Sequence, residues 1–473
     1  MTAIPRLVLS APHGRSGKTT LCLGLAAAFA GRGLRVQPFK KGPDYIDPGW
    51  LGEAAGRPCR NLDLFLVEAG ALLAGFGRAC QSADLALIEG AHGLYDGLDG
   101  EGTNSTAQLA RLLQAPVVLV IDASRMTQSV AALVRGFQDF QPGVNVAGVI
   151  LNQVANPRHR AKLADALSRH VKIPLLGALP RGPSLTIPDR HLGLVPRDEE
   201  AGLLPVVEEL RRAVEASVDL DGLLDLARRA PPLALSPVPP IAALAPSVRL
   251  GVARDRAFTF YYPENLEALR RAGAELVPLD TLEDRSLPEV DGLYLGGGFP
   301  EMFLEALEAN EGLRRDIRRA VSDGLPVYAE CGGLMYLARR ITWNGRSASM
   351  VGALPCDIEM TAGIQGHGYV RGRVAGANPY FPIGTALRGH EFHYSRVTGL
   401  EAGEFAFSLE RGRGIAGGKD GLVVENVLAA YTHLHALGAP GWAEGLVAQA
   451  HAYREGRVQA SPLTPTLSPR GRG

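Results

Sequence analysis

Short apolar segments and segments with a helical pattern follow one another in turn over the first 180 residues. Short apolar runs, rich in valine, isoleucine and leucine, are separated by stretches with helical spacing of apolar positions. The runs lie at residues 7–9, 34–36, 85–88, 116–122, 146–151 and 173–179. Buried strands separated by helices are typical of right-handed crossovers in a parallel sheet. The pattern predicts a doubly wound α/β domain over residues 1–195.

The pattern changes in the next segment. Residues 199–229 carry acidic and basic positions that predict a single helix, and prolines are concentrated at 236–240. A charged helix followed by a proline-rich stretch is typical of the connection between two domains. We therefore expect a helical and proline-rich linker over residues 196–246.

Strand and helix patterns alternate again after this linker. Apolar runs lie at 248–252, 275–279, 292–295 and 326–329, and glycine-rich strand segments follow between 347 and 397. This order predicts a second α/β domain with antiparallel additions over residues 247–457. The last residues, 458–473, are rich in proline, glycine and arginine and are expected to form a disordered tail.

Composition limits the functions open to such a chain. The 473 residues carry 49 basic and 49 acidic side chains, so net charge gives no reason to expect binding to nucleic acid or an anionic membrane. No apolar run reaches the ~18 residues of a membrane-spanning helix, and the first residues lack the order of a signal peptide. We expect a cytoplasmic protein whose five cysteines, which form no C-x-x-C pair, are reduced thiols rather than zinc ligands.

A loop rich in glycine, serine and threonine follows the first strand. Residues 10–20 read Ser-Ala-Pro-His-Gly-Arg-Ser-Gly-Lys-Thr-Thr. In a phosphate-binding loop of this kind, backbone N–H groups and the helix N-terminus hold the phosphates, the lysine reaches the outer phosphates and the threonine binds Mg²⁺. Pro12 stands where the usual motif has its first glycine, so a helix N-terminus with a chance Gly-Lys-Thr is the alternative. The expected nucleotide-binding residues are His13, Gly14, Ser16, Gly17, Lys18, Thr19 and Thr20.

Two acidic segments follow the second and third strands. Asp44 and Asp47 lie in the first, and Glu89 directly ends an otherwise apolar strand. Because ligands bind at the carboxyl ends of parallel strands, we expect these carboxylates near a Mg²⁺ ion that Thr19 also binds. Turn formation beside prolines would explain Asp44 and Asp47 equally well, and a surface loop would explain Asp96.

The second domain contains a cysteine on a sharp turn. Cys331 follows the strand 325–330 and precedes a helix that begins at 332. Such a turn exposes a thiol at a helix N-terminus, where the helix dipole favours the thiolate. A small buried side chain is the common alternative for a free cysteine.

Two further motifs favour catalysis at Cys331. A glycine triplet ends the preceding strand, so Gly297 and Gly298 can present backbone N–H groups to an oxyanion. His433 follows a late apolar run and can deprotonate the thiol, although a core histidine is the default for one such residue. Together these motifs predict nucleophilic acyl chemistry. The segment 388–396, which mixes polar and aromatic residues, carries no assigned chemistry and would also suit a solvated edge strand.

A nucleotide site combined with a cysteine nucleophile indicates that ATP use is coupled to ammonia released from an amide. With these motifs the chain resembles the glutamine-hydrolysing corrinoid amidotransferases, in the family of cobyrinate (hydrogenobyrinate) a,c-diamide synthases. The resemblance covers residues 6–457 and rests on seven segments in the family's order. They are GKTT (17–20), KGPDYIDP (41–48), EGAHGLYDG (89–97), GGGFPE (296–301), ECGG (330–333), GHEFHYS (389–395) and YTHLH (431–435).

For the first domain the resemblance implies the dethiobiotin-synthetase-like branch of phosphate-loop proteins, in which the first loop glycine is also displaced. It implies that ATP phosphorylates a carboxylate of a corrin-type tetrapyrrole, and that ammonia then attacks the acyl phosphate in two successive cycles. Lys18 and Mg²⁺ would neutralise the transferred charge, with the ion held by Thr19, Asp47 and Glu89. The residues expected to face the tetrapyrrole are Asp44, Tyr45 and Asp96.

For the second domain the resemblance implies a class I glutamine amidotransferase. Cys331 would attack the amide of L-glutamine with His433 as its base. Gly297 and Gly298 would form part of the oxyanion hole. The usual triad has a glutamate two residues after the histidine, but His435 stands there in this chain and in the corrinoid branch. What orients the imidazole of His433 is therefore left open.

Three other interpretations remain on these grounds. The first is cobyric acid synthase, which shares the two-domain plan but usually carries Gln-Asn-Met where this chain has Gly-Pro-Asp-Tyr. The second is a nickel-sirohydrochlorin a,c-diamide synthase, which the motifs alone do not distinguish from a cobyrinate a,c-diamide synthase. A partition-type ATPase with an inactive second domain would place a lysine at His13 and, in membrane-bound members, end in a basic amphipathic helix. The expected partners are thus ATP, L-glutamine and a tetrapyrrole. The metal state of the macrocycle and homodimer formation are left open.

Overall fold

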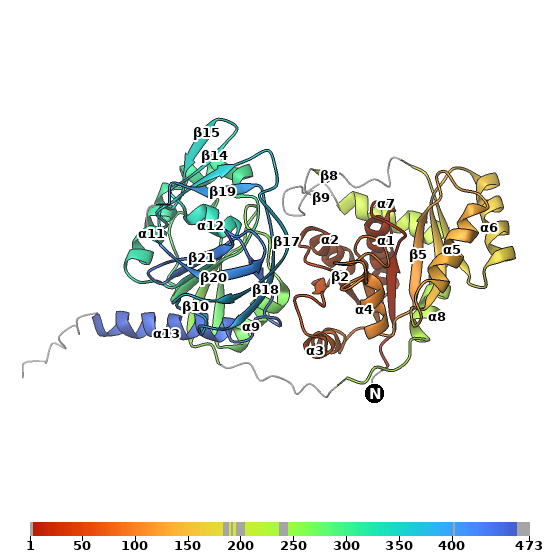
Figure 1. Cartoon of the computed structure of the whole chain (residues 1–473), viewed down its shortest axis with the longest axis horizontal. Coiled ribbons are helices and arrows are strands. Elements are labelled where there is room, and N and C mark those ends of the chain that lie inside the picture. The colour runs from red at the N-terminus through yellow and green to blue at the C-terminus, as the bar shows by residue number, and fades with distance from the viewer. Residues whose placement is uncertain are drawn as a thin grey trace, which may run out of the picture. The chain divides into compact units, whose positions relative to one another are not determined.

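A computed structural model describes most of the chain, which falls into two units. The described residues are 3–182, 189–190, 193–194, 204–235, 245–400 and 403–460. One unit comprises Met1–Ile241 with Thr259–Asn265, and the other comprises Ala242–Phe258 with Leu266–Gly473 (Figure 1). The expected proline-rich stretch at 236–240 and most of the expected tail lie outside the described residues.

The first unit is built on a seven-stranded sheet with the order β3-β2-β4-β1-β5-β6-β7. Its strands are β1 (Arg6–Ser10), β2 (Val36–Lys41), β3 (Arg60–Leu62), β4 (Leu85–Glu89), β5 (Val117–Asp122), β6 (Val146–Val154) and β7 (Leu175–Pro180). The helices between them are α1 (Lys18–Gly31), α2 (Ile46–Ala55), α3 (Ala69–Ala79), α4 (Thr106–Leu112), α5 (Ser129–Asp139) and α6 (Pro157–His170). Every neighbouring pair of strands is parallel, which confirms the predicted doubly wound fold. Two short strands, β8 (Asp189–Arg190) and β9 (Gly193–Leu194), pair antiparallel after this sheet.

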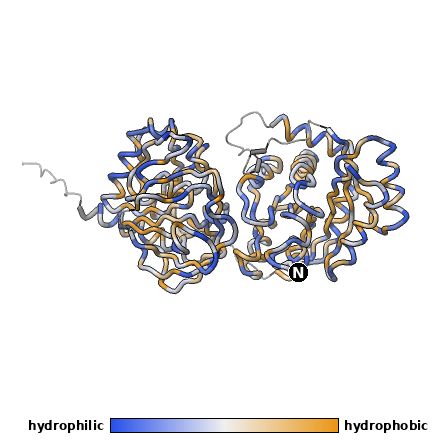
Figure 2. Tube along the Cα trace, turned by 45° about the horizontal axis from the view of Figure 1, so that its top comes forward, coloured by the Kyte–Doolittle hydropathy of each residue, from blue (hydrophilic) through white to orange (hydrophobic). Residues whose placement is uncertain are grey.

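Burial explains why this sheet forms. Strands β1 and β4 are buried along their whole length, and Figure 2 shows hydrophobic stretches interspersed with hydrophilic ones along the chain. Helix α1 is buried on almost all sides because a further helix, α7 (Leu204–Ser217), packs along it. Gly24 allows this close packing, since a Cβ there would lie 2.8 Å from the carbonyl oxygen of Leu210.

The segment after the sheet differs from the prediction of one helix over 199–229 within a linker. The described residues form two helices, α7 and α8 (Leu220–Arg228). They separate because Asp219 caps α8 through a hydrogen bond from a backbone N–H of its first turn, and because Val218 forms a β-bridge with Gly177. Apolar side chains of both helices belong to the core of the first unit. These helices are therefore part of the folded domain rather than a linker.

The second unit contains a ten-stranded sheet with the order β11-β10-β12-β13-β22-β21-β20-β17-β18-β23. The pairs from β11 to β22 are parallel and the remaining pairs are antiparallel, which confirms the predicted α/β domain with antiparallel additions. Its strands are β10 (Val248–Ala253), β11 (Ala274–Leu279), β12 (Gly292–Leu295), β13 (Val327–Glu330), β17 (Gly366–Val374), β18 (Ala386–His393), β20 (Glu404–Arg411), β21 (Lys419–Val424), β22 (Val427–Ala430) and β23 (His433–Leu434).

A smaller four-stranded sheet and several helices complete this unit. The sheet has the order β15-β14-β16-β19. Its strands are β14 (Arg340–Trp343), β15 (Arg346–Ser349), β16 (Asp357–Met360) and β19 (Ser395–Thr398). The helices are the 3₁₀ turn η3 (Pro300–Phe303), α10 (Leu304–Ala309), α11 (Glu311–Ser322), α12 (Gly332–Leu337), α13 (Trp442–Ala460) and most of α9 (Pro263–Arg271), whose first residues are counted with the first unit.

Helix α13 packs against β10 and β12. Its Trp442 meets the rings of Tyr294 and Tyr328 edge-on, at centroid distances of 5.3 and 5.2 Å. The helix continues to Ala460, past the boundary expected at 457. Within the described ranges, no helix combines the length and apolar character needed to cross a membrane.

Candidate active sites

The phosphate-binding loop lies between the carboxyl end of β1 and the N-terminus of α1. Gly17 has a left-handed backbone, with φ of 90°, that favours glycine. A Cβ at Gly17 would lie 2.1 Å from Asn152 Nδ2, and that amide donates a hydrogen bond to the Ser16 carbonyl at 3.1 Å. Asn152, near the end of β6, thus supports the loop although no local motif singles it out. The predicted residues His13, Gly14, Ser16, Gly17, Lys18, Thr19 and Thr20 all lie in this loop or in the first turn of α1.

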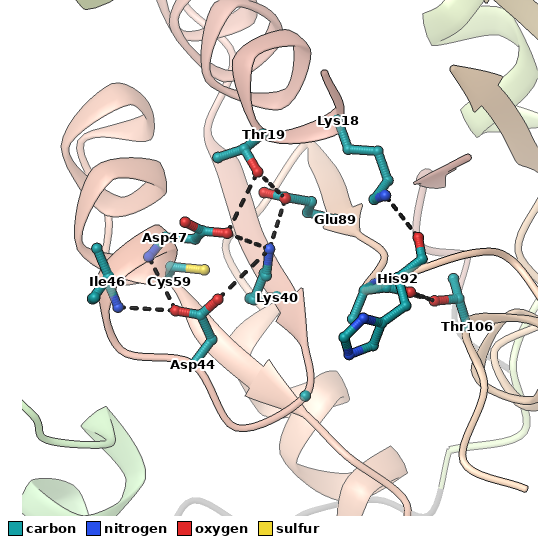
Figure 3. Close-up of polar contacts among 12 residues, drawn as sticks. Lys18, Thr19, Lys40, Asp44, Ile46, Asp47, Cys59, Glu89, His92 and Thr106 are labelled. Atoms are coloured by element: carbon teal, nitrogen blue, oxygen red, sulfur yellow. Dashed lines mark hydrogen bonds and ion pairs between the residues drawn. The ribbon is translucent and has the colours of Figure 1, made fainter. Parts of the chain in front are cut away.

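Lys18 is held by carbonyl oxygens at this loop. Its Nζ donates to the carbonyl of His13 at 3.1 Å and to that of His92 at 2.7 Å, as Figure 3 shows for His92. Burial lowers the pKa of Lys18 from its usual value, and the charge of Glu89 opposes this effect. The ammonium group therefore sits where phosphate oxygens could replace carbonyl oxygens as its partners.

The predicted acids Asp47 and Glu89 converge on Thr19 (Figure 3). Thr19 Oγ1 donates to Glu89 Oε1 at 2.6 Å and lies 3.4 Å from Asp47 Oδ2. Lys40, at the end of β2, reaches the same group: its Nζ lies 2.5 Å from Asp47 Oδ2 and 2.7 Å from Glu89 Oε1. Lys40 was not predicted, although a lysine within a buried strand is a signal that could have indicated it.

Burial and mutual charge set the protonation of this cluster. Burial alone would lower the pKa of Lys40, but the charges of Asp47, Glu89 and Asp44 outweigh it, so this pKa lies well above its usual value. Burial raises the pKa of Glu89. Burial, and next the charge of Asp47, raise the pKa of Asp44 to about 7.

Asp44 also lies two residues before helix α2 and contacts its first turn. Its Oδ1 accepts hydrogen bonds from the backbone N–H groups of Ile46 at 2.9 Å and Asp47 at 3.1 Å. Its other oxygen lies 3.7 Å from Lys40 Nζ. Asp44 therefore performs the turn chemistry considered as an alternative for it and also belongs to the charged cluster. Tyr45 directly precedes α2.

The cluster fits a magnesium ion. Among the described residues Glu89 Oε2 is buried without a hydrogen-bond partner. The described part of the chain holds no group of three or more His, Cys, Asp or Glu side chains arranged for a metal. Mg²⁺ is commonly bound by one or two carboxylates together with phosphate oxygens and water. Thr19, Asp47 and Glu89 supply such a set beside the phosphate loop.

Asp96 lies in the loop that follows β4. Its Oδ2 accepts a hydrogen bond from the backbone N–H of Gly93 at 2.9 Å. A Cβ at Gly93 would lie 2.5 Å from the carbonyl oxygen of Pro12, so this loop packs against the phosphate loop. Asp96 stabilises that arrangement, and its role toward a substrate stays a prediction.

The turn around Cys331 has a strained geometry. Cys331 links β13 to α12 with φ of 47°, a value uncommon for a residue with a side chain. Its backbone N–H donates to the carbonyl of Ala430 at 2.7 Å. Strain of this kind recurs at active sites, where surrounding contacts maintain it.

The thiol itself differs from the expectation of an exposed group. Cys331 is only 5% exposed, and burial, followed by the charge of Glu301, raises its pKa well above the usual value. The cause is close packing: a Cβ at Gly332 would lie 2.9 Å from Gly298 N, and one at Gly333 would lie 2.3 Å from the Leu295 carbonyl oxygen. The resting thiol is therefore neutral, and its proton must leave during the attack.

The predicted oxyanion segment lies beside this turn. Gly298 packs against the backbone of Ala257, where a Cβ would lie 1.9 Å from the carbonyl oxygen. The backbone nitrogen of Gly298 lies close to Gly332, where a Cβ would be 2.9 Å from it. Gly297 directly precedes Gly298 in the chain. The structure thus places the backbone nitrogen of Gly298 beside the residue that follows Cys331, and its role as an oxyanion donor stays a prediction.

Gly298→Ala is expected to destabilise the protein by about 1–3 kcal/mol and to remove glutamine hydrolysis, because the added methyl group displaces the backbone of Ala257 or of the turn. Thermal unfolding and glutamate release measure the two effects. Gly363→Ala is the matched control, since a Cβ there meets nothing within 4 Å. Wild-type stability and glutaminase activity of Gly298→Ala would contradict this prediction.

His433 is the first residue of β23, the strand that follows β22 along the chain. Because β13 pairs parallel with β22, the end of β13 at Glu330 lies opposite Ala430, and the chain then leads within three residues to His433. His433 is 2% exposed and its ring stacks on that of His390 at a centroid distance of 4.9 Å. Burial lowers the pKa of His390 well below its usual value, so this neighbour stays neutral.

The segment 388–396 contributes several buried side chains to these surroundings, although Phe392 and Arg396 are exposed. His393 stacks on Tyr431 at 3.7 Å, and Ser395 Oγ hydrogen bonds with the Tyr431 hydroxyl at 2.9 Å. The carboxylate of Glu391 accepts hydrogen bonds from the backbone N–H groups of residues 413 and 414. The segment therefore packs around the strand that carries His433.

All five cysteines, Cys22, Cys59, Cys80, Cys331 and Cys356, are free and buried. Burial raises the pKa of each of these thiols. Cys331 alone among them lies on the strained turn, since the other four have no left-handed backbone.

Comparison with known proteins covers both units. Residues 7–195 match the CobQ/CobB/MinD/ParA nucleotide binding domain, and residues 249–440 match the CobB/CobQ-like glutamine amidotransferase domain. A solved glutamine amidotransferase structure covers 42% of this chain and 98% of its own at a TM-score of 0.32 and 20% identity, which is too low a likeness to carry an argument.

Two curated relatives align over nearly their whole length. A cobyrinate a,c-diamide synthase of Magnetococcus marinus is 50% identical, with coverage of 93% of this chain and 96% of that protein. One of Methanosarcina barkeri is 40% identical, with coverage of 96% and 98%. The chain therefore belongs to the cobyrinate a,c-diamide synthase family of glutamine-hydrolysing ligases.

Proposed function

We propose that this enzyme amidates the a and c carboxylates of cobyrinate or hydrogenobyrinate with ATP and L-glutamine, as a step of cobalamin biosynthesis. The observation that carries the proposal is the pairing of two sites in one chain: a phosphate loop with converging carboxylates, and a strained cysteine turn beside a glycine N–H donor. The identity to named relatives over nearly the full length supports the substrate. ATP and glutamine are cytoplasmic metabolites, so the cytoplasm is the proposed compartment.

In the amidotransferase unit, Cys331 and His433 release ammonia. As Sγ of Cys331 attacks the amide carbon, its proton passes to His433, and the N–H groups of Gly297 and Gly298 bind the oxyanion. Collapse of this adduct breaks the C–N bond, and His433 returns the proton to the leaving nitrogen as ammonia forms. Water then hydrolyses the thioester, which yields glutamate and restores the thiol.

In the nucleotide-binding unit, a substrate carboxylate oxygen attacks the terminal phosphorus of ATP, and ADP leaves. Lys18 exchanges its carbonyl partners for phosphate oxygens and neutralises charge in transfer. Mg²⁺, held by Thr19, Asp47 and Glu89, would supply further neutralisation at the phosphates. Ammonia attacks the acyl phosphate, phosphate leaves, and the amide forms. The proposed substrate-facing residues are Asp44, Tyr45 and Asp96.

Mass spectrometry of the products tests this proposal. The purified full chain is given ATP, glutamine and, in separate reactions, cobyrinate, hydrogenobyrinate or nickel-sirohydrochlorin. We expect two successive amidations of one of the first two substrates and no further ones. Four amidations, or amidation of nickel-sirohydrochlorin alone, would contradict the proposed function.

A further inference from the structure

We propose that Glu330, the residue directly before the nucleophile, positions the imidazole of His433 for proton transfer. The inference rests on the proposed roles of Cys331 and His433 in glutamine hydrolysis and assigns the missing third member of that group. In this chain His435 stands at the position where a glutamate is expected.

The first argument is distance. Glu330 ends β13, is 1% exposed, and places Oε2 at 3.5 Å from Nδ1 of His433. Its Oε1 accepts a hydrogen bond from the backbone N–H of Leu434 at 3.0 Å. The same carboxylate therefore contacts the histidine ring and the backbone of the next residue. Such contacts in the free enzyme are commonly long and shorten once substrate is bound.

The second argument is that the carboxylate is itself fixed. Tyr328 donates its hydroxyl to Glu330 Oε1 at 3.1 Å, and Tyr294 donates to Oε2 at 3.2 Å. Burial, followed by the charge of Glu330, raises the pKa of Tyr328 well above its usual value, so this hydroxyl stays a donor. Both tyrosine rings pack against Trp442. The position of Glu330 is thus set by the core of the unit.

The third argument is chemical. A carboxylate facing Nδ1 favours the tautomer with the proton on that nitrogen, so that Nε2 can serve as the base for Cys331. When His433 becomes an imidazolium, the negative charge of Glu330 stabilises it at close range. Because the pKa of Cys331 is raised by burial, its proton transfer needs this help.

Two other groups near His433 have different tasks. His435 Nδ1 accepts a hydrogen bond from the backbone N–H of Leu437 at 3.2 Å, so this nitrogen serves the following turn. Asp420 accepts the backbone N–H groups of Tyr431 at 3.0 Å and Thr432 at 2.9 Å. It fixes the chain before the histidine, whereas Glu330 reaches the ring.

Glu330→Gln in the full chain tests the proposal. We expect kcat for glutamine hydrolysis to fall about 10²–10⁴-fold, the range set by loss of the third member of a triad. KM for glutamine should stay within roughly threefold, and amidation with added ammonium should keep its rate, because ring orientation matters only to proton transfer. In a His433→Ala background, Glu330→Gln should cost nothing further in glutamine hydrolysis.

The matched control is Glu359→Gln, which removes the charge of a partly exposed glutamate paired with Arg396 and should leave every rate unchanged. A Glu330→Gln enzyme with wild-type kcat, or one that loses ammonium-driven amidation equally, would overturn the proposal. If that variant fails to fold, Glu330→Asp replaces it: the shorter carboxylate should lower kcat at least about tenfold, and full activity would overturn the proposal. Glutamine hydrolysis that survives Cys331→Ala would instead contradict the proposed function.

Discussion

Cys331→Ala is expected to abolish amide formation from glutamine while amidation with added ammonium continues near the wild-type rate. Without the thiol no thioester forms, so glutamine hydrolysis should fall on the order of 10⁴-fold or more. The phosphate loop and its carboxylates belong to the other unit and are untouched by the change. Amide formation from each nitrogen source, followed by mass spectrometry, measures both effects.

The matched control is Cys356→Ala, which removes another buried thiol of the same unit. It should keep both activities, because Cys356 lies on no strained turn. A folded Cys331→Ala protein that has lost ammonium-driven amidation as well would show that amide hydrolysis and acid activation are not separable between the two units.

Lys18→Met is expected to have the complementary result. Amidation should fall about 10²–10³-fold with glutamine and with ammonium alike, because a positioned charge at the transferred phosphoryl group is lost. Methionine keeps an unbranched side chain of nearly the same length but has no positive charge and no N–H to donate to phosphate oxygens. Glutamate release should remain measurable, because the thiol turn is unchanged. Parallel assays of amide formation and glutamate release give the comparison.

Lys172→Met provides the control, since Lys172 is an exposed lysine of the same unit outside the phosphate loop. It should amidate at the wild-type rate. Normal amidation by Lys18→Met would contradict the assigned role of the loop.

Patterns of neighbouring residues predicted much of this structure because burial and turn formation depend largely on residues close together in the sequence. Apolar runs such as that of β4 are buried on both faces, which is why the alternation identified a parallel sheet. The strand, turn and helix around Cys331 were likewise readable from a few adjacent residues. The sequence wrongly predicted an exposed thiol. The thiol is buried because Gly298, from a distant segment, packs against the turn, and the residues adjacent to Cys331 do not indicate this contact.

Contacts between distant residues explain what was missed. Asn152 reaches the phosphate loop from 136 positions away, and Lys40 reaches Glu89 from 49 positions away. The contact of Glu330 with His433 depends on the parallel pairing of β13 with β22. The division of 199–229 into two helices follows from a β-bridge of Val218 with the sheet. The spacing of motifs within a short segment does not indicate such contacts between distant residues.

A doubly labelled reaction tests the central claim most directly, namely that glutamine nitrogen released at Cys331 replaces a carboxylate oxygen carried off by phosphate. The enzyme is given glutamine with ¹⁵N in its amide and tetrapyrrole with ¹⁸O in its carboxylates, and the products are analysed by mass spectrometry. We predict one ¹⁵N in each new amide and one ¹⁸O in the phosphate released with it. Phosphate without ¹⁸O, or amides without ¹⁵N when no ammonium is added, would contradict the account.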